Sequence, residues 1–282
     1  MYNLGSSFFN IVGIIQARMG ASRLPGKVLL DIEGEPMLVR VVERTKRAKS
    51  LTEILVATSL EKADDPIEQL CTAKGYICYR GSQQDVLDRY YQAARAYSAD
   101  VIVRITADCP VIDPLVIDQT VAAFWGYGKK MITETDGLVE VGSPTEISSP
   151  PKWDFAANRL PPPWQRTFPI GLDTEVSTFS ALERAWEEAT QAHQREHVMP
   201  YLYENENLFR ILLVNHAPDY GHLRWTVDTA QDLELIREIY SRFEGRDDFS
   251  WIEVLELFRQ EPDLAEINRG VSHQDYRDVD SR

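Results

Sequence analysis

Short apolar runs alternate with segments of helical periodicity along the first 125 residues. The runs of strand length lie at 11–15, 53–58, 76–79 and 101–106. Between them, apolar residues recur at helical spacing, opposite polar faces, over 36–47, 66–74, 86–97 and 114–125. Strands that alternate with helices in this way predict an α/β fold with a doubly wound, mainly parallel sheet.

The pattern is lost after residue 125, where the chain becomes rich in Gly, Pro, Ser and Thr. This composition predicts an insertion or a partner-contacting arm over 126–170 rather than core, with one short strand at 154–158. Regular patterning then returns. It predicts strands over 171–177, 210–214 and 223–227, and helices over 180–190, 196–203, 230–243 and 251–259.

One main domain accounts for these elements. We expect an N-terminal extension over 1–10, the domain over 11–245, and C-terminal helices over 246–271. The last segment, 272–282, is polar and charged, so we expect it to be frayed.

Composition narrows the class of protein. With 44% hydrophobic and 26% charged residues the chain resembles ordinary soluble domains, and 30 basic against 44 acidic residues give a net charge of −14. This acidity argues against a nucleic-acid or anionic-membrane surface, which needs a broad basic patch. Three cysteines without C-x-x-C spacing, no signal-peptide start and no apolar run of about 20 residues predict a cytoplasmic protein.

Three cations crowd into the loop that follows the first predicted strand: Arg18, Arg23 and Lys27. Gly20 and Gly26 lie in the same loop and would let backbone N–H groups approach an anion closely. A solvated turn could also be basic, but such crowding is unexpected in so acidic a chain. Because ligands of open α/β sheets bind beyond the carboxyl ends of the strands, the loop is placed to bind phosphate.

Several familiar site motifs are excluded. Five residues separate Gly20 from Gly26, and Val28 stands where a Walker A loop needs a hydroxyl. No G-x-S-x-G or G-x-G-x-x-G pattern occurs. His193 and His197 are four residues apart, but the first lacks the neighbouring Glu of H-E-x-x-H, which disfavours zinc.

Two aspartates each follow a predicted strand. Asp108 comes after the run at 101–106, and Asp228 after the one at 223–227. Alone, either residue could be a turn residue or a helix N-cap. Together, at strand ends facing a cationic loop, they predict a site for Mg²⁺, which prefers one or two carboxylates with phosphate oxygens and water.

The loop segment Ile15–Lys27 (IQARMGASRLPGK) resembles the signature of the sugar cytidylyltransferases, the family of CMP-acylneuraminate and CMP-Kdo synthetases, and in particular its SpsF-like branch of spore-coat polysaccharide proteins. Further matches to this branch lie at 80–90, 104–114, 171–176, 195–198 and 223–229. Ala107 replaces the usual Gly before the metal aspartate, and 128–153 resembles an insertion.

The resemblance implies roles for particular residues and a sheet of the nucleotide-diphospho-sugar transferase type, a GT-A-like Rossmann fold. Implied nucleotide contacts are Gln16, Ala17, Arg18, Gly20, Arg23, Gly26, Lys27, Arg80 and Arg104. Lys27, Arg18 and Asp108 would be catalytic, and Asp108 and Asp228 would hold Mg²⁺. Implied contacts to the sugar are Asn158, Asp173, Glu175, Arg195 and Glu196.

The resemblance therefore implies a Mg²⁺-dependent enzyme that joins CTP or another NTP to a sugar or sugar acid and releases pyrophosphate, for surface polysaccharide or glycan synthesis. Family members commonly form homodimers, so we expect one here. Two alternatives stay open at this point. One is a GT-A-type glycosyltransferase that consumes an NDP-sugar; the other is a catalytically degenerate nucleotide-binding regulator or scaffold.

Overall fold

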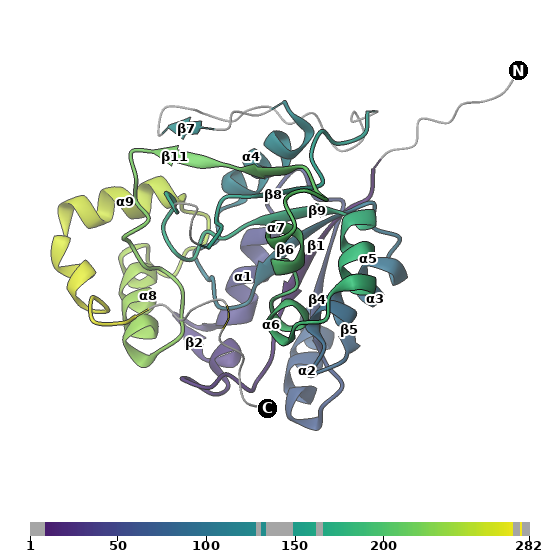
Figure 1. The fold of residues 1–282 in the computed structure, drawn as a ribbon. Helices are drawn as coiled ribbons and strands as arrows, with labels where there is room; N and C mark the ends of the chain where they lie inside the picture. The colour runs from purple at the N-terminus through teal and green to yellow at the C-terminus, as the bar shows by residue number, and fades with distance from the viewer. Residues whose placement is uncertain (1–8, 128–130, 134–148, 162–165, 273–276, 278–282) are drawn as a thin grey trace, which may run out of the picture.

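A seven-stranded sheet forms the centre of the computed structural model, which describes residues 9–127, 131–133, 149–161, 166–272 and 277 (Figure 1). The strand order is β10-β8-β9-β6-β1-β4-β5. The strands are β1 (Ile11–Gln16), β4 (Glu53–Ser59), β5 (Ile77–Gly81), β6 (Val101–Thr106), β8 (Phe155–Ala157), β9 (Glu175–Thr178) and β10 (Ile211–Leu213). Only β9 runs antiparallel to its neighbours in this sheet, so the prediction of a mainly parallel α/β sheet is confirmed.

The helices cover both faces of the sheet (Figure 1). They are α1 (Met37–Thr45), α2 (Asp65–Lys74), α3 (Val86–Ala96), α4 (Pro114–Trp125), α5 (Phe179–Glu188), α6 (Ala192–His197), α7 (Pro200–Glu204), α8 (Ala230–Arg242) and α9 (Trp251–Gln260). Short 3₁₀ turns occur at η1 (Lys27–Leu29), η2 (Lys62–Asp64) and η4 (Pro262–Glu266). Two small ladders complete the described elements: β2 (Asp31–Ile32) with β3 (Glu35–Pro36), and β7 (Met131–Thr133) with β11 (Asn215–Ala217).

Strand β1 shows why the core has two halves. Side chains alternate across a strand, so Ile11 and Ile15 join the buried cluster that includes α1, α4, α8 and α9. Val12 and Ile14 join the opposite cluster with α3, α5 and α7. Burial on both faces explains the unbroken apolar run in the sequence. None of the described helices is long and apolar enough to cross a membrane.

Three sequence predictions need correction or refinement. The helix predicted over 196–203 is two helices, α6 and α7, separated at Val198, whose φ of 73° ends the first helix before Pro200 starts the second. The segment predicted as arm contains β8, which is buried in the main sheet, so part of it is core. The rest of that segment lies partly outside the described residues, and the domain boundaries stay a prediction.

The predicted strand at 223–227 is also wrong. The segment forms no strand of a described sheet. It makes an isolated β-bridge between Arg224 and Ile170. Gly171 makes that approach possible: its φ is +114°, and a Cβ there would lie 2.6 Å from the carbonyl carbon of Trp225. The segment is therefore buried in the core without joining the main sheet, and it leads directly to Asp228.

Candidate functional site

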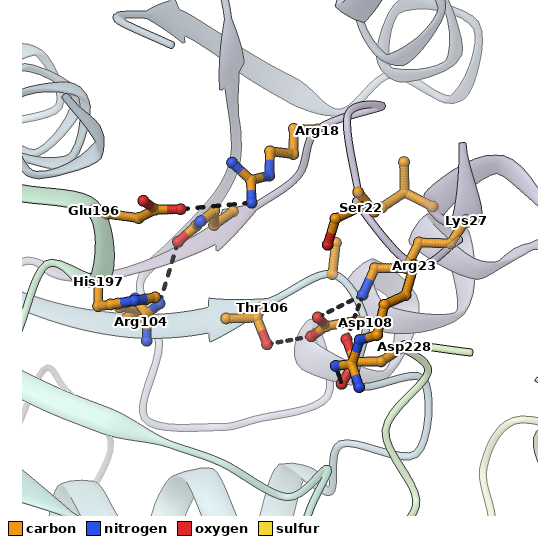
Figure 2. Close-up of a pocket in the computed structure, with 14 residues that line it drawn as sticks. Arg18, Ser22, Arg23, Lys27, Arg104, Thr106, Asp108, Glu196, His197 and Asp228 are labelled. Atoms are coloured by element: carbon orange, nitrogen blue, oxygen red, sulfur yellow. Dashed lines mark hydrogen bonds and ion pairs between the residues drawn. The ribbon is translucent and has the colours of Figure 1, made fainter. Parts of the chain in front are cut away.

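A pocket of about 210 Å³ opens beyond the carboxyl ends of β1 and β6, the edge at which ligands bind open α/β sheets. Its walls come from the loop after β1, the end of β6, helix α6 and the turn before α8. Figure 2 shows two groups of side chains in it. Lys27, Arg23, Asp108 and Asp228 lie on one side, and Arg18, Arg104, Glu196 and His197 on the other.

The loop after β1 is folded back on itself. Gly26 takes a left-handed conformation with φ 73° and donates its N–H to the Met19 carbonyl at 2.8 Å. Its N–H is thus used to close the loop instead of facing an anion. The closed loop brings the side chains of Arg18, Arg23 and Lys27 to one pocket, as the sequence predicts.

Buried Asp64 anchors this loop from η2. Its Oδ1 accepts the N–H of Met19 at 2.7 Å, and its Oδ2 accepts both the N–H and the hydroxyl of Ser59. No sequence motif marks this role, because Asp64 and Met19 are 45 positions apart. Asp64 therefore ties the end of β4 to the cationic loop.

We expect Asp64→Ala to destabilise the protein by about 1–3 kcal/mol, since it leaves a part-buried N–H without its acceptor. The measurement is urea unfolding. Asp65→Ala is the matched control, because Asp65 has an exposed side chain whose described ion pair is with Arg80, and its loss should change stability by less than about 1 kcal/mol. Equal effects of the two substitutions would contradict the anchoring role.

Lys27 lies between the two predicted metal ligands. Its Nζ is 2.9 Å from Asp108 Oδ2, 2.9 Å from Asp228 Oδ1 and 2.7 Å from the carbonyl oxygen of Val227. Asp228 reaches this position although it does not end a sheet strand. Backbone pairing brings it there, because the N–H of Val227 donates to the Asp108 carbonyl at 2.8 Å.

The remaining carboxylate oxygens are also hydrogen-bonded or ion-paired. Thr106 donates its hydroxyl to Asp108 Oδ1 at 2.5 Å. Asp228 Oδ2 lies 2.9 Å from Arg23 Nη2 and 2.7 Å from Arg224 Nη2. Among the residues that the structure describes, no group of three or more His, Cys, Asp or Glu side chains could hold a metal ion.

The electrostatics of the ion pair between Lys27 and Asp228 keep both side chains charged at neutral pH. Burial alone would lower the pKa of Lys27, but Asp108 and Asp228 outweigh it and raise that pKa above its ordinary value. Burial would raise the pKa of Asp228, but the charge of Lys27 and the hydrogen bonds from Lys27 and Arg224 hold that pKa well below its usual range. An ammonium therefore faces a carboxylate here at physiological pH.

The opposite side of the pocket carries a second set of ion pairs (Figure 2). Arg18 Nη2 lies 3.7 Å from Glu196 Oε1. Arg104 donates to Gln16 Oε1 at 3.3 Å and pairs with Glu175, which is buried behind it. Burial would lower the pKa of Arg104, but Glu175 keeps that pKa raised, so the guanidinium stays charged.

The structure gathers about half of the residues that the sequence singles out. Those that line the pocket are Gln16, Arg18, Arg23, Lys27, Arg104, Asp108, Glu196 and Asp228. Ala17 is buried beside them, and neither Gly20 nor Gly26 is among the lining residues. Ser22, Thr106 and His197 also line the pocket; each lies in a segment that resembles the family, but no ligand contact is predicted for them from the sequence.

Four other residues that the sequence predicts as ligand contacts make ion pairs or hydrogen bonds elsewhere in the protein. Arg80 pairs with Asp65 and Glu68 on α2, and Arg195 pairs with Asp85. Buried Asn158 bridges the Leu172 carbonyl and the Thr174 N–H, and Asp173 pairs with Arg166. The pocket lining does not include these four predicted contacts. Their assignment to base or sugar stays a prediction without support from this geometry.

A cationic loop faces paired carboxylates at the carboxyl edge of a mainly parallel sheet, which is the position of the ligand site in nucleotide-binding proteins of the open α/β class.

The chain belongs to the cytidylyltransferase family, whose model matches residues 12–259. It is 30% identical over 265 residues to the spore coat polysaccharide biosynthesis protein SpsF of Bacillus subtilis, covering 91% of this chain and 97% of that protein. Over 124 residues it is 40% identical to 3-deoxy-manno-octulosonate cytidylyltransferase of Trichlorobacter lovleyi, covering 44% and 48% of the two chains. The solved structure of a cytidylyltransferase from Leptospira borgpetersenii aligns with TM-score 0.78 and 31% identity, over 94% of this chain and all of that one. These relatives make this chain a nucleotidyltransferase and confirm the family, the fold class and the enzyme class expected from the sequence.

Proposed function

We propose that the protein transfers the cytidylyl group of CTP to a hydroxyl of a sugar or sugar acid, releases pyrophosphate and depends on Mg²⁺. The observation that carries this proposal is the position of Lys27 between Asp108 and Asp228, opposite Arg18. The family supports CTP as the nucleotide, and the likeness to SpsF supports a role in surface polysaccharide synthesis.

Asp108 and Asp228 would hold the magnesium ion. Lys27 Nζ lies within 2.9 Å of an oxygen of each, so the two carboxylates already converge on a single cation. Their hard oxygen atoms fit Mg²⁺, which takes one or two carboxylates and completes its shell with phosphate oxygens and water. When bound, the ion would neutralise charge that builds on the reacting phosphates.

The chain's own cations would orient the triphosphate. Lys27 and Arg23 can exchange a carboxylate oxygen for a phosphate oxygen, since both carry long, flexible stems. Arg18 lies on the other side of the pocket, beside Glu196 (Figure 2). In the transfer, a bond forms between the acceptor oxygen and the α-phosphorus, and the bond from the α-phosphorus to the leaving pyrophosphate breaks. Catalysis then consists of positioning and of electrostatic stabilisation.

The acceptor hydroxyl must lose a proton. Glu196 and His197 of α6 lie in the pocket on the side away from Lys27 (Figure 2), and we assign them to the acceptor, where one of them would take this proton. A sugar acid is the acceptor we favour, because a relative is named for 3-deoxy-manno-octulosonate and the opening motif resembles those of the sugar-acid cytidylyltransferases. We also propose that the protein acts as a homodimer, which light scattering after size exclusion would test.

The test of the function is a pyrophosphate-release screen of the four NTPs against sugars, sugar acids and sugar phosphates, with and without Mg²⁺. We expect release only with CTP, an acceptor and the metal. Consumption of an NDP-sugar without pyrophosphate would indicate a glycosyltransferase instead. Binding of CTP without product under every acceptor would indicate a regulator.

A further inference from the structure

Behind the pocket, a buried network surrounds Asp228. Arg224, 8% exposed, donates from Nη2 to Asp228 Oδ2 at 2.7 Å. The same guanidinium donates from Nε to Asp232 Oδ1 at 2.9 Å and from Nη2 to Asp232 Oδ2 at 3.1 Å. Arg224 therefore bridges two aspartates, only one of which lines the pocket.

Asp232 is fully buried and holds the backbone of Asp228 as well. Its Oδ2 accepts the N–H of Asp228 and the N–H of Thr229, each at 3.0 Å. Its Oδ1 accepts from Nδ2 of Asn268, beyond η4, which also donates to the Arg224 carbonyl at 3.0 Å. Both the main chain and the side chain of Asp228 are thus fixed through Asp232.

Helix capping explains only part of this arrangement. Thr229 and Asp232 form a capping box at the start of α8, which satisfies backbone groups of the first turn. A capping box needs neither a buried arginine nor Asn268. A charged guanidinium removed from water requires a compensating charge, and Asp232 supplies it. Arg224 therefore does not need both oxygens of Asp228 as hydrogen-bond acceptors.

We propose that Asp232 is a positioning residue for nucleotidyl transfer: through Arg224 and the Asp228 N–H, it sets the orientation of the carboxylate that holds the divalent cation. This inference rests on the proposed function. Outer partners that orient a metal ligand typically contribute 10- to 100-fold to metal affinity or activity. Without the charge of Asp232, Asp228 would be the remaining carboxylate partner of Arg224 among the described ion pairs, and Arg224 would compete with the cation for it.

The test is Asp232→Asn, with Mn²⁺ as the probe. Water-proton relaxation separates Mn²⁺ in a complex with protein and CTP from Mn²⁺ bound to CTP in solution, and it needs no acceptor and no turnover. We expect the dissociation constant of Mn²⁺ from the ternary complex to rise at least about 10-fold. The conservative variant Asp232→Glu, which keeps the charge, should recover part of this loss.

Thr229→Ala is the matched control. It removes the capping hydroxyl of α8 together with its one donation to Asp232 Oδ2, but it leaves the hydrogen bonds of Asp232 with Arg224 and with the Asp228 N–H. It should therefore lower the melting temperature and leave Mn²⁺ affinity within about 3-fold of wild type. If Asp232→Asn and Thr229→Ala shift Mn²⁺ affinity alike, Asp232 only caps the helix and the inference is wrong.

Two further outcomes are informative. If Asp232→Asn does not fold, Asn268→Ala removes the side chain that donates to both Asp232 and the Arg224 carbonyl, and the inference then requires weaker Mn²⁺ binding in that variant; wild-type affinity there would overturn it. If wild-type protein forms no ternary complex at all, the metal part of the proposed function fails first. A wild-type complex that Asp232→Asn leaves unchanged refutes the positioning role alone.

Discussion

Replacing Lys27 by Met is expected to reduce turnover by about 10²-fold or more, the scale observed when one preorganised electrostatic group is lost from an active site. Three oxygen atoms within 2.9 Å hold the ammonium in the pocket, where a phosphate oxygen would take the place of a carboxylate partner. Met keeps the length and much of the volume of the side chain. Pyrophosphate release with saturating CTP and acceptor measures the effect.

A matched control is Lys46→Met. Lys46 lies at the end of α1, pairs with Glu43 at the surface and lies outside the pocket lining. We expect unchanged turnover from it. Near-normal activity of Lys27→Met would remove Lys27 from the mechanism, whatever its position in the structure.

The second large effect is expected from Asp108→Asn. The amide keeps the shape of the carboxylate and can still accept the Thr106 hydroxyl, so we expect the fold to be retained. It lacks the charge that attracts a divalent cation. Turnover at saturating Mg²⁺ should fall by at least about 10³-fold, beyond the loss of a single donor.

The measurement is the Mg²⁺ dependence of pyrophosphate release, together with thermal unfolding to confirm the fold. Asp100→Asn is a fitting comparison, since Asp100 precedes the opposite end of β6 and accepts the N–H of Asn10 far from the pocket. An unaltered Mg²⁺ response in Asp108→Asn would disprove the metal assignment.

Local signals in the sequence predicted the elements of the first half closely. The bounds of β6 and α4 agree with the structure, because β6 is an apolar run and α4 has an Asp113 cap, a first-turn proline and a Gly126 end. Each of these signals is local, so no partner need be known to recognise it.

Long-range pairing could not be predicted in the same way. The segment 223–227 has the alternation of a strand, yet the close backbone approach at Gly171 lets it pack beside the sheet without joining it. Asp228 nevertheless lies beside Asp108, because the backbone hydrogen bond from Val227 to the Asp108 carbonyl brings the two aspartates together.

The candidate site was predicted unevenly for a related reason. Charges crowded into one loop, such as Arg23 and Lys27, are recognisable from spacing alone. Whether Asn158 or Arg195 faces a ligand depends on its partners within the protein. Asn158 hydrogen-bonds the backbone of residues 172 and 174, and Arg195 pairs with Asp85, which is distant in the sequence. Family motifs identify such residues without indicating whether they act on substrate or on structure.

The saturation of the Asp108 and Asp228 oxygens by Thr106, Lys27, Arg23 and Arg224 has a thermodynamic consequence. A cation that arrives alone must displace Lys27, whereas a triphosphate gives Lys27 and Arg23 new partners and frees the carboxylates. Ion and nucleotide should therefore bind with positive cooperativity. Because such coupling is reciprocal, CTP should tighten Mn²⁺ binding by the same factor by which Mn²⁺ tightens CTP binding.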